Sequence, residues 1–459
     1  MAVPPSAQET KEASVRARQF FFLFSAFNRF QQWNKHLSPK DKVCLQAATL
    51  LLDGQAAAAL RLLQPPPKNP GFAWSYNLGL ALEMAGGGKL ASYWLGRAEN
   101  LNPHLFRKLR EPKTPPFRIV FLFSYLGPTG AIKVLLHQAH YLQSQGHEVL
   151  ALVPEQFISP LPWPVEFPLL TFEINTSPPQ LPTSDAIIVA DWPVIPLTLG
   201  KGETSFFYYA QGEIATLRPE TIPASIYNLK TQFLSLPMLL LAVSPYLGEK
   251  LRSASFRTYR LLPPGIDNCF FSEEEKGIRF PPRFLFVGPD IPHKGPDLAL
   301  ETVALVRSRI PRAEFTWVTP WPVKRRFEGR HIVNPSPEKL ACIYREADVL
   351  LHTSTAESFP LPPLEAMAAG TPVVATDSGG IRTYARPGKN CLVCSERNPY
   401  LLARYALQLI EEPGLYSRLS REGRKTAALH RWEMSDRLLS RILEESLSRP
   451  RPAWPCGSS

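Results

Sequence analysis

The sequence lacks a long apolar run and has few cysteines. No apolar run reaches the ~18 residues that a membrane-spanning helix needs, so we expect no segment that crosses a bilayer. The first residues, MAVPPSAQETKEASVRAR, lack the basic and then apolar order of a secretory leader. The six cysteines are widely scattered apart from Cys391 and Cys394, which does not suggest a disulfide framework. These absences favour a cytoplasmic chain in a reducing compartment.

Metal-ligand patterns are also scarce. Cys391 and Cys394 form one C-x-x-C, but no second pair and no neighbouring histidine cluster completes the four ligands of a zinc site. We therefore predict no metal and no cofactor.

Basic residues are concentrated at the N-terminal end. The chain carries 51 Lys+Arg against 40 Asp+Glu, a net charge of +11, and residues 1–110 hold 14 against 6, a net of +8. Such a region would suit a protein partner or the inner face of a membrane, although a diffuse basic surface is the plainer reading. The aromatic segment 20–27, flanked by arginines, fits either a membrane interface or a buried first helix. We predict no nucleic-acid partner.

The composition is otherwise that of a globular protein of 459 residues, enough for about three domains. Hydrophobic residues make up 44% of the chain, so most of it can bury a core. Proline is abundant, with 48 residues against 26 glycines, and we expect many rigid loops.

Residues 50–103 have a helical pattern, with small and apolar residues at three- and four-residue spacing. The second stretch resembles a tetratricopeptide repeat, because Leu78 and Gly79 begin it, small residues follow in the next helix and Pro103 closes it. Only one unit matches well, and an isolated unit is not stable. We therefore expect residues 1–111 to form a helical region that packs on its neighbour or caps a short array, either to contact another protein or as a scaffold.

Two strand-first halves follow. In the first, the apolar run 118–124 precedes a loop containing Gly127 and Gly130, a helical pattern over 131–145 and a strand at 147–153. Further strands are predicted at 186–190, 205–209, 240–243, 283–287, 314–318, 347–351, 372–375 and 391–393. This alternation predicts an α/β fold with two Rossmann-like domains facing a ligand cleft, preceded by an all-α domain.

Two glutamates in the second half are well placed for a ligand. Glu357 ends a loop after a predicted strand, and Glu365, separated from it by seven residues, lies at the start of a predicted helix. Both can face one ligand at the carboxyl end of a parallel sheet. Free backbone N–H groups at the helix start could hold phosphate oxygens.

An ordered set of motifs surrounds these glutamates. Lys294-Gly295 follows Gly288, Pro264-Gly265-Ile266-Asp267 precedes the domain junction, and Gly379-Gly380 and Trp432-Glu433 follow the glutamates. The set resembles the retaining group 1 glycosyltransferases, family four in the usual classification, which have the two-domain GT-B fold. The resemblance covers residues 117–439.

The resemblance implies a role for each matching residue. Glu357 would contact a hydroxyl of the donor sugar, and Glu365 the ribose of the nucleotide. Lys294 would neutralise the diphosphate leaving group, where charge develops in the transition state. The remaining donor-binding candidates are Gly288, Ser358, Phe359 and Leu361, the last two through backbone near the diphosphate.

The sequence departs from the family pattern inside this site. Where the family usually has an arginine after Gly288, this chain has Pro289, which offers no charge to a phosphate. His293 or a basic residue elsewhere is a candidate to compensate. Pro360 replaces a usual glycine and lacks an N–H, which removes one possible phosphate donor.

The half of the chain that we expect to bind the acceptor has fewer recognisable motifs. The glycine loop suggests Gly127 and Gly130 as acceptor-side candidates, while Asp191 and Glu213 follow predicted strands and could border the cleft. The string 208–213 faintly resembles a sugar-polymer synthesis subgroup of the same family.

The resemblance implies a retaining, metal-independent glycosyltransferase. We expect it to move a sugar from a nucleotide diphosphate to a saccharide or lipid-linked acceptor, in the synthesis of a cell-surface polysaccharide or glycan. The predicted domains are 1–111 (helical), 117–275 (acceptor), 276–430 (nucleotide sugar) and a terminal helix, 431–448, that crosses back to the acceptor domain. One alternative is a degenerate transferase that acts as a binding or scaffold protein through its helical N-terminus. The other is a phosphorylase or hydrolase on the same fold.

Overall fold

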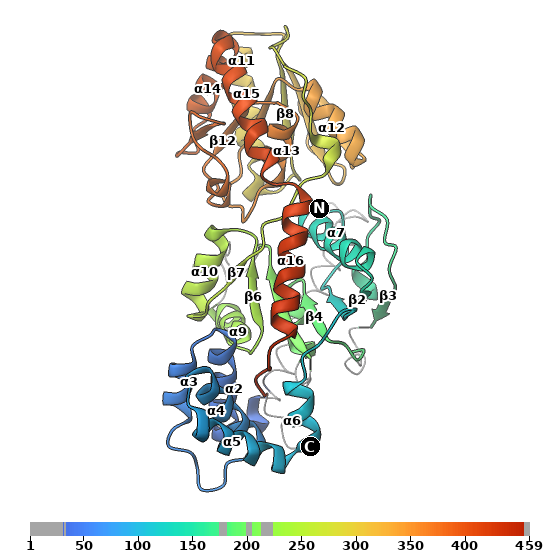
Figure 1. Ribbon diagram of the computed structural model, residues 1–459. Helices are drawn as coiled ribbons and strands as arrows, with labels where there is room; N and C mark the ends of the chain where they lie inside the picture. The colour runs from blue at the N-terminus through green and yellow to red at the C-terminus, as the bar shows by residue number, and fades with distance from the viewer. Residues whose placement is uncertain (1–30, 32–33, 174–180, 199–203, 213–223, 454–459) are drawn as a thin grey trace, which may run out of the picture.

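The computed structural model describes the chain except for residues 1–30, 32–33, 174–180, 199–203, 213–223 and 454–459. A group of helices lies at one end of the molecule, and two sheet-containing domains follow it along the long axis (Figure 1). Within the described residues, no helix is both long and apolar enough to cross a membrane. The aromatic segment 20–27 lies outside the described residues.

The N-terminal helices pack around a small core of their own. They are α2 (Pro39–Leu52), α3 (Ala56–Leu63), α4 (Phe72–Met84), α5 (Gly88–Leu101) and α6 (Pro103–Arg110). Gly79 allows α4 and α5 to approach closely, because a Cβ there would lie 2.8 Å from Leu95 Cγ. The helical pattern of residues 50–103 thus corresponds to helices, whereas the resemblance to a tetratricopeptide repeat stays a prediction.

The first sheet is parallel and has the strand order β3-β2-β1-β4-β5-β6-β7. Its strands are β1 (Arg118–Leu122), β2 (Glu148–Pro154), β3 (Leu169–Phe172), β4 (Ala186–Val189), β5 (Ser205–Ala210), β6 (Leu239–Ala242) and β7 (Arg260–Leu261). The helices that accompany it are α7 (Gly130–Ser144), α9 (Ala224–Leu234) and α10 (Pro245–Ser255). Apolar runs such as Ala186–Val189 are buried throughout, as expected of central parallel strands.

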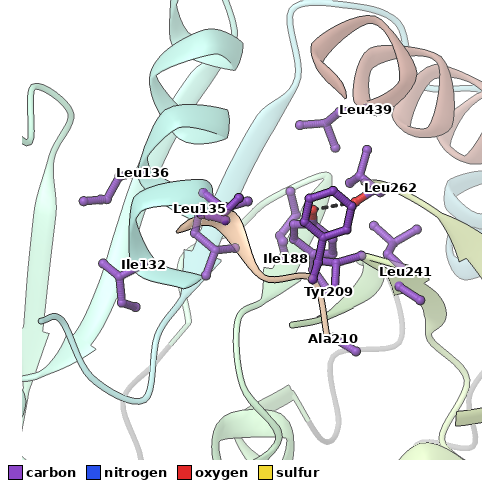
Figure 2. Packing of buried hydrophobic residues seen from close by; sticks show 14 of the residues in the cluster. Ile132, Leu135, Leu136, Ile188, Tyr209, Ala210, Leu241, Leu262 and Leu439 are labelled. Atoms are coloured by element: carbon purple, nitrogen blue, oxygen red, sulfur yellow. Dashed lines mark hydrogen bonds between the residues drawn. The ribbon is translucent and has the colours of Figure 1, made fainter. Parts of the chain in front are cut away.

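Tyr209, near the end of β5, lies in the core of this domain (Figure 2). Its ring packs among aliphatic side chains that include Leu135 of α7 and Leu241 of β6. Its hydroxyl donates a 2.7 Å hydrogen bond to the backbone carbonyl of Leu262, so the buried polar atom is satisfied. Leu439, which comes from the far end of the chain, reaches the same core.

The second sheet is also parallel, with the order β10-β9-β8-β11-β12-β13. Its strands are β8 (Arg283–Val287), β9 (Glu314–Thr319), β10 (Arg330–Val333), β11 (Val349–His352), β12 (Val373–Thr376) and β13 (Leu392–Cys394). Its helices are α11 (Pro296–Arg307), α12 (Pro337–Glu346), α13 (Leu361–Ala368), α14 (Pro399–Glu411) and α15 (Pro413–Ala428). Two parallel sheets with helices confirm the predicted fold class.

Three short strands were not among those predicted: β3, β7 and β10. Two of them are the outermost strands of the first sheet and the third is an outer strand of the second. Their side chains are largely exposed or half-buried, so they lack the continuous apolar run that identifies a central strand.

The terminal helix α16 (Trp432–Leu447) begins at the second domain and lies along the first (Figure 1). The hydroxyl groups of Tyr141 on α7 and Ser440 on α16 are 3.1 Å apart. Arg260 of β7 donates a 2.8 Å hydrogen bond to Glu445 near the end of α16. Together with Leu439, these contacts join the chain's end to the first domain.

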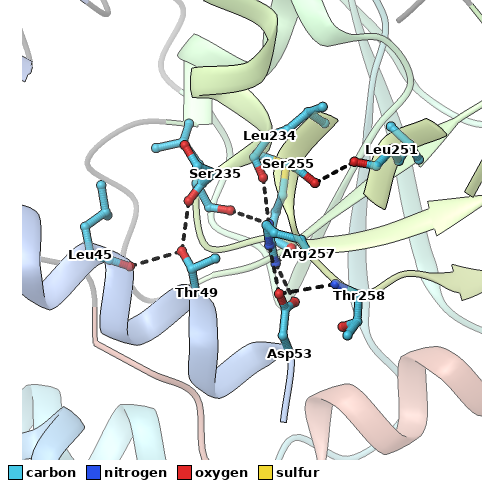
Figure 3. Close-up of polar contacts among 11 residues, drawn as sticks. Leu45, Thr49, Asp53, Leu234, Ser235, Leu251, Ser255, Arg257 and Thr258 are labelled. Carbon is cyan, nitrogen blue, oxygen red and sulfur yellow. Dashed lines mark hydrogen bonds and ion pairs between the residues drawn. The ribbon is translucent and has the colours of Figure 1, made fainter. Parts of the chain in front are cut away.

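A buried ion pair joins the N-terminal helices to the first domain (Figure 3). The guanidinium of Arg257 contacts Asp53, which caps the end of α2, at 2.9 Å, and both side chains are at most 3% exposed. Arg257 also donates to the backbone carbonyls of Leu234, Leu236 and Met238. Because the charge is fully hydrogen-bonded, the pair fixes the docking geometry of α2.

Candidate active site

A cavity of ≈ 560 Å³ lies between the two sheet-containing domains. The loops that line it follow the carboxyl ends of strands in both sheets, which is where open α/β sheets bind ligands. Its volume is within the usual range for small-molecule sites. Another cavity, of ≈ 630 Å³, lies among α2, α4, the start of β5 and the end of the chain, and none of the predicted site residues lines it.

The centre of the site is an ion pair between Lys294 and Glu357. Lys294 Nζ donates to Glu357 Oε1 at 2.6 Å, and Ser354 Oγ donates to the same oxygen at 2.9 Å. Within the described residues, no group donates a hydrogen bond to Oε2. The carboxylate is therefore held in place by one oxygen and can accept a ligand hydroxyl with the other.

Burial would raise the pKa of Glu357, but the nearby Lys294 ammonium outweighs it and holds the pKa below the usual range. Glu357 is thus ionised at neutral pH. Since the partner is itself a cation, the pair is electrically balanced as long as no anion enters the cleft. A bound diphosphate would give Lys294 a second anionic partner.

The local backbone explains why Lys294 lies beside Glu357. Lys294 ends a single-turn 3-10 helix, and Gly295 follows it with a φ of +71°. A Cβ on Gly295 would lie 2.2 Å from the carbonyl oxygen of Thr353, so only glycine fits there. The Thr353 hydroxyl also donates a 2.7 Å hydrogen bond to the Gly295 carbonyl. The loop after β8 is therefore fixed against the loop after β11, and the two ends of the ion pair come from these loops.

The start of α13 forms another wall of the cavity. Ser358, Phe359 and Leu361, all predicted donor-binding residues, line it. Among the described residues, none forms a hydrogen bond with the buried hydroxyl of Ser358, which is unusual for a buried polar group. Pro360 and Pro362 contribute no N–H, so the backbone donors at this wall are fewer than at an ordinary helix start.

Glu365, predicted to bind the ribose, lines the same cavity from α13. Its Oε2 accepts a 2.9 Å hydrogen bond from the Tyr344 hydroxyl, and Lys133 Nζ lies 3.4 Å from its Oε1. Burial is the largest influence on this carboxyl and raises its pKa above the usual range, although Lys133 opposes the shift.

The first domain contributes Gly130 to the cavity, directly opposite α13. A Cβ on Gly130 would lie 3.3 Å from Leu361 Cδ1, so the glycine loop and the donor-side helix nearly touch. Gly127 and Asp191 do not line the cavity. Asp191 instead accepts 2.8 Å hydrogen bonds from the Ser124 hydroxyl and from the backbone N–H of Trp192. Glu213 lies outside the described residues.

The structure also shows what surrounds Pro289, where the family usually has an arginine. Pro289 and Gly288 both line the cavity. The nearby Arg325 is held by Asp290, at 2.9 Å, and by Asp297, and does not line it. His293 lines the cavity, but burial and then the neighbouring Lys294 lower its pKa, so the ring is neutral near pH 7. Neither residue therefore replaces the missing positive charge.

Sequence reasoning missed several residues that line the cavity. They are Tyr125, Lys133, Trp163 and Gln211 in the first domain and Trp321 in the second. Lys133 lies on a helix directly after the glycine loop, and this position in the sequence could have indicated that it borders the cleft. The tryptophans lie in loops whose course no local pattern predicts. Among the described residues, no group of three His, Cys, Asp or Glu side chains is arranged to hold a metal ion.

Comparison with known proteins places this site in a family context. Residues 281–412 match the family model described as glycosyl transferases group 1. The D-inositol 3-phosphate glycosyltransferase of Acidothermus cellulolyticus is 30% identical over 228 residues, which cover 42% of this chain and 49% of that protein. The enzyme of the same name from Thermobispora bispora is 34% identical over 125 residues, 27% of this chain and 29% of that protein. The chain thus spans at most about half the length of these relatives.

Solved structures resemble the chain over a larger part of its length. The Anabaena protein HepE in complex with UDP-glucose matches with a TM-score of 0.59 at 15% identity, over 72% of this chain and 100% of that one. Sucrose-phosphate synthase from Thermosynechococcus elongatus matches with a TM-score of 0.58 at 17% identity, over 72% and 99%. At such identities the likeness shows the fold, with two Rossmann-like domains facing a cleft.

Proposed function

We propose that the protein transfers a sugar from a nucleotide diphosphate to a saccharide or lipid-linked acceptor. Residues 281–412, in the second domain, match the group 1 glycosyltransferase model, and the chain has the GT-B fold. The observation that carries the proposal is the Lys294–Glu357 ion pair, which lies in the interdomain cavity beside Ser358, whose hydroxyl has no hydrogen-bond partner among the described residues. A cation, a carboxylate and a free hydroxyl at one wall suit a charged diphosphate next to a polyhydroxylated ring.

Each side chain has a role in this reaction. Lys294 neutralises the diphosphate as the bond between the sugar and its phosphate oxygen breaks, and such placed charge is usually a large contribution to catalysis. Glu357 accepts a hydrogen bond from a hydroxyl of the donor sugar, and Glu365 accepts one from a ribose hydroxyl. Gly288 lets the nucleotide approach the backbone closely, while Ser358 and the N–H groups of Phe359 and Leu361 contact phosphate oxygens.

We further propose that the anomeric configuration is retained and that no metal or cofactor takes part. In this mechanism the acceptor oxygen bonds to the anomeric carbon on the face from which the phosphate leaves, and the acceptor proton passes to the departing diphosphate. No dedicated protein base is then required. The acceptor enters from the first domain, between the glycine loop at Gly130 and the side chains of Trp163 and Gln211.

The names of similar proteins suggest which substrates to test first. HepE was solved with UDP-glucose, and the curated relatives are named for D-inositol 3-phosphate. A panel of UDP-, GDP- and ADP-sugars, offered with inositol phosphates, oligosaccharides and polyprenyl-linked sugars, covers the proposed classes. Product analysis by NMR should find one transferred sugar whose anomeric configuration matches the donor. Cleavage by phosphate or water without transfer would instead indicate a phosphorylase or a hydrolase.

Pro289 favours a second candidate function, a transferase that has lost activity and serves as a binding or scaffold protein. Among the described lining residues, the one cation besides Lys294 is Lys133, which is already paired with Asp267 and Glu365. The basic N-terminal quarter could recruit a protein or a membrane surface at the cytoplasmic face. Calorimetry decides between the two: heat of binding with a nucleotide sugar supports the transferase, and its absence for the whole panel supports the scaffold.

A further inference from the structure

The chain crosses between the two domains twice, and the two crossing segments contact each other. The backbone N–H of Ile266 donates to the carbonyl of His430 at 3.0 Å, where the chain passes into the second domain and returns from it. The indole N–H of Trp432 donates to Asp267 at 2.8 Å. A Cβ on Gly265 would lie 2.5 Å from the Trp432 backbone, so the two segments are in close contact. Asp267 is therefore held in place where the chain crosses between the domains.

Lys133 connects this crossing to the predicted nucleotide site. It projects from α7 of the first domain, and its Nζ lies 2.8 Å from Asp267 Oδ2 and 3.4 Å from Glu365 Oε1. The ammonium also lies 5.0 Å from the centre of the Phe270 ring, a further favourable contact for a cation. The Lys133 side chain is only 12% exposed and that of Glu365 only 6%. A single buried cation is thus shared between the crossing and the second domain.

The sharing is unequal. The short contact is to Asp267, while the contact to Glu365 is at the long end of a hydrogen bond. Burial would lower the pKa of Lys133, but the two carboxylates outweigh it and raise the pKa, so the side chain carries its charge. Glu365 needs this charge, because a buried carboxylate without a cation is costly and tends to bind a proton instead.

The other described groups around Glu365 do not supply a positive charge. The titratable side chains that face it, beside Lys133, are those of Asp267, Cys269, Tyr344 and Tyr384. Burial raises the pKa of both tyrosines and of Cys269, so these three are neutral near pH 7, and Asp267 is anionic. Among the described residues, Lys133, from the opposite domain, is the cation that favours the ionised form of Glu365.

We propose that Lys133 is a positioning residue for the nucleotide: from the first domain it holds the Glu365 carboxylate ready for the ribose hydroxyls, so that donor binding in the second domain depends on the assembled cleft. This inference rests on the proposed function, since it takes Glu365 as the ribose acceptor. Hydrogen bonds to a carboxylate are roughly twice as strong as those to a neutral group. Without Lys133 the pKa of Glu365 would rise further, so the ribose would meet a carboxyl group that is more often protonated and is then a weaker acceptor.

The test is a double-mutant cycle on donor affinity, measured by calorimetry from pH 6 to 9 with the nucleotide sugar that the wild type accepts. The variants are Lys133→Met, Glu365→Gln and the double variant. We expect Lys133→Met to weaken binding about 10-fold at pH 7, the difference between a charged and a neutral hydrogen bond. The loss should shrink as the pH rises and Glu365 ionises. In the Glu365→Gln background, Lys133→Met should have little further effect.

Two controls keep the outcome clear. Lys133→Arg preserves the charge and should retain most of the affinity for the nucleotide sugar. If the lysine stem had a purely structural role, Lys133→Met would leave the pH dependence of this affinity unchanged. Carboxyl NMR of the free protein, with Glu365→Gln to assign the signal, should show a higher pKa for Glu365 in Lys133→Met whether or not any nucleotide binds.

The two ways of failing are distinct. If the wild type binds no nucleotide sugar, the proposed function is wrong and the inference falls with it. If the wild type binds normally but Lys133→Met binds equally well, or loses the same affinity in the Glu365→Gln background, only the inference is wrong.

Discussion

The two Rossmann-like domains present the same kind of edge to the cleft but very different side chains. In the second domain, the lining residues include the Lys294–Glu357 pair and Glu365. Among the described lining residues of the first domain, Lys133 is the sole charged side chain, and it serves a carboxylate of the other domain. The charged groups that we propose for a diphosphate sugar are thus concentrated in one domain, while the other offers the aromatic and amide groups of Tyr125, Trp163 and Gln211. Both domains have a Rossmann-like fold, but the side chains that they contribute to the cleft differ in charge.

Glu357→Gln should give the largest effect if this division is correct. The variant keeps the shape but removes the negative partner of Lys294, and we expect kcat/KM to fall by about 10²–10³, the usual loss for a placed polar group at a reacting centre. Steady-state kinetics with the accepted donor measure this. Glu301→Gln, at an exposed position on α11, is the matched control and should keep full activity. Equal activities of the two variants would refute the role of Glu357.

Acid should destabilise the second domain through His352. Burial lowers the pKa of this histidine from 6.5 to about 4, so the folded state keeps it neutral while the unfolded chain takes up a proton. The stability that this histidine contributes is complete above pH 6.5 and is lost as the pH falls toward 4, by up to about 3 kcal/mol.

Chemical denaturation across this pH range, followed in wild type and His352→Gln, measures that contribution. The variant should lose less stability than the wild type between pH 6.5 and 4. Parallel curves for the two proteins would mean that His352 is not the cause. In the first domain, burial also lowers the pKa of His140 and His147, but both are half-exposed, so their contribution should be smaller.

Two tryptophans, one from each domain, test the division between donor and acceptor. Trp163 lines the cleft from the first domain and Trp321 from the second. Trp163→Ala should raise the KM for the acceptor about 10-fold, the effect of losing one stacked or buried aromatic contact, and leave donor hydrolysis unchanged. Trp321→Ala should raise the KM for the donor instead. If both variants change the same KM, the two walls are not separate binding sites.

Pro289→Arg should have the smallest effect, and in the opposite direction. The new arginine would lie at the cavity wall and offer a second cation to the diphosphate, so we expect donor affinity to rise a few-fold, as for a partly exposed charged contact. Thermal-shift titration with the donor detects such a gain by mass action. A loss of affinity would mean that Pro289 is required by the shape of this loop.

The sequence was sufficient for features that depend on local order. The alternation of strands and helices predicted the fold class, and the motif spacing identified Glu357, Glu365 and Lys294 as a group; the structure brings all three to one cavity. Pro289 was recognised as a departure, but the ion pairs that keep Arg325 from replacing the lost charge required coordinates.

Contacts between distant segments could not be predicted. Lys133 and Glu365 are 232 residues apart, and their contact depends on how two domains meet. Asp191 was selected because it follows a strand, yet its carboxylate is used by Ser124 and Trp192, which no spacing rule indicates. Short outer strands such as β10 also escape prediction, because their half-exposed residues carry little apolar pattern.

The most direct test of the account is the affinity of Lys294→Ala for the nucleotide sugar, by calorimetry beside wild type and the exposed-site control Lys339→Ala. We predict that wild type and control bind with equal affinity. Loss of Lys294 should weaken binding at least about 10-fold, because the diphosphate loses its cation and Glu357 then repels it. Unchanged affinity in Lys294→Ala would contradict the claim that this cleft binds a nucleotide diphosphate sugar.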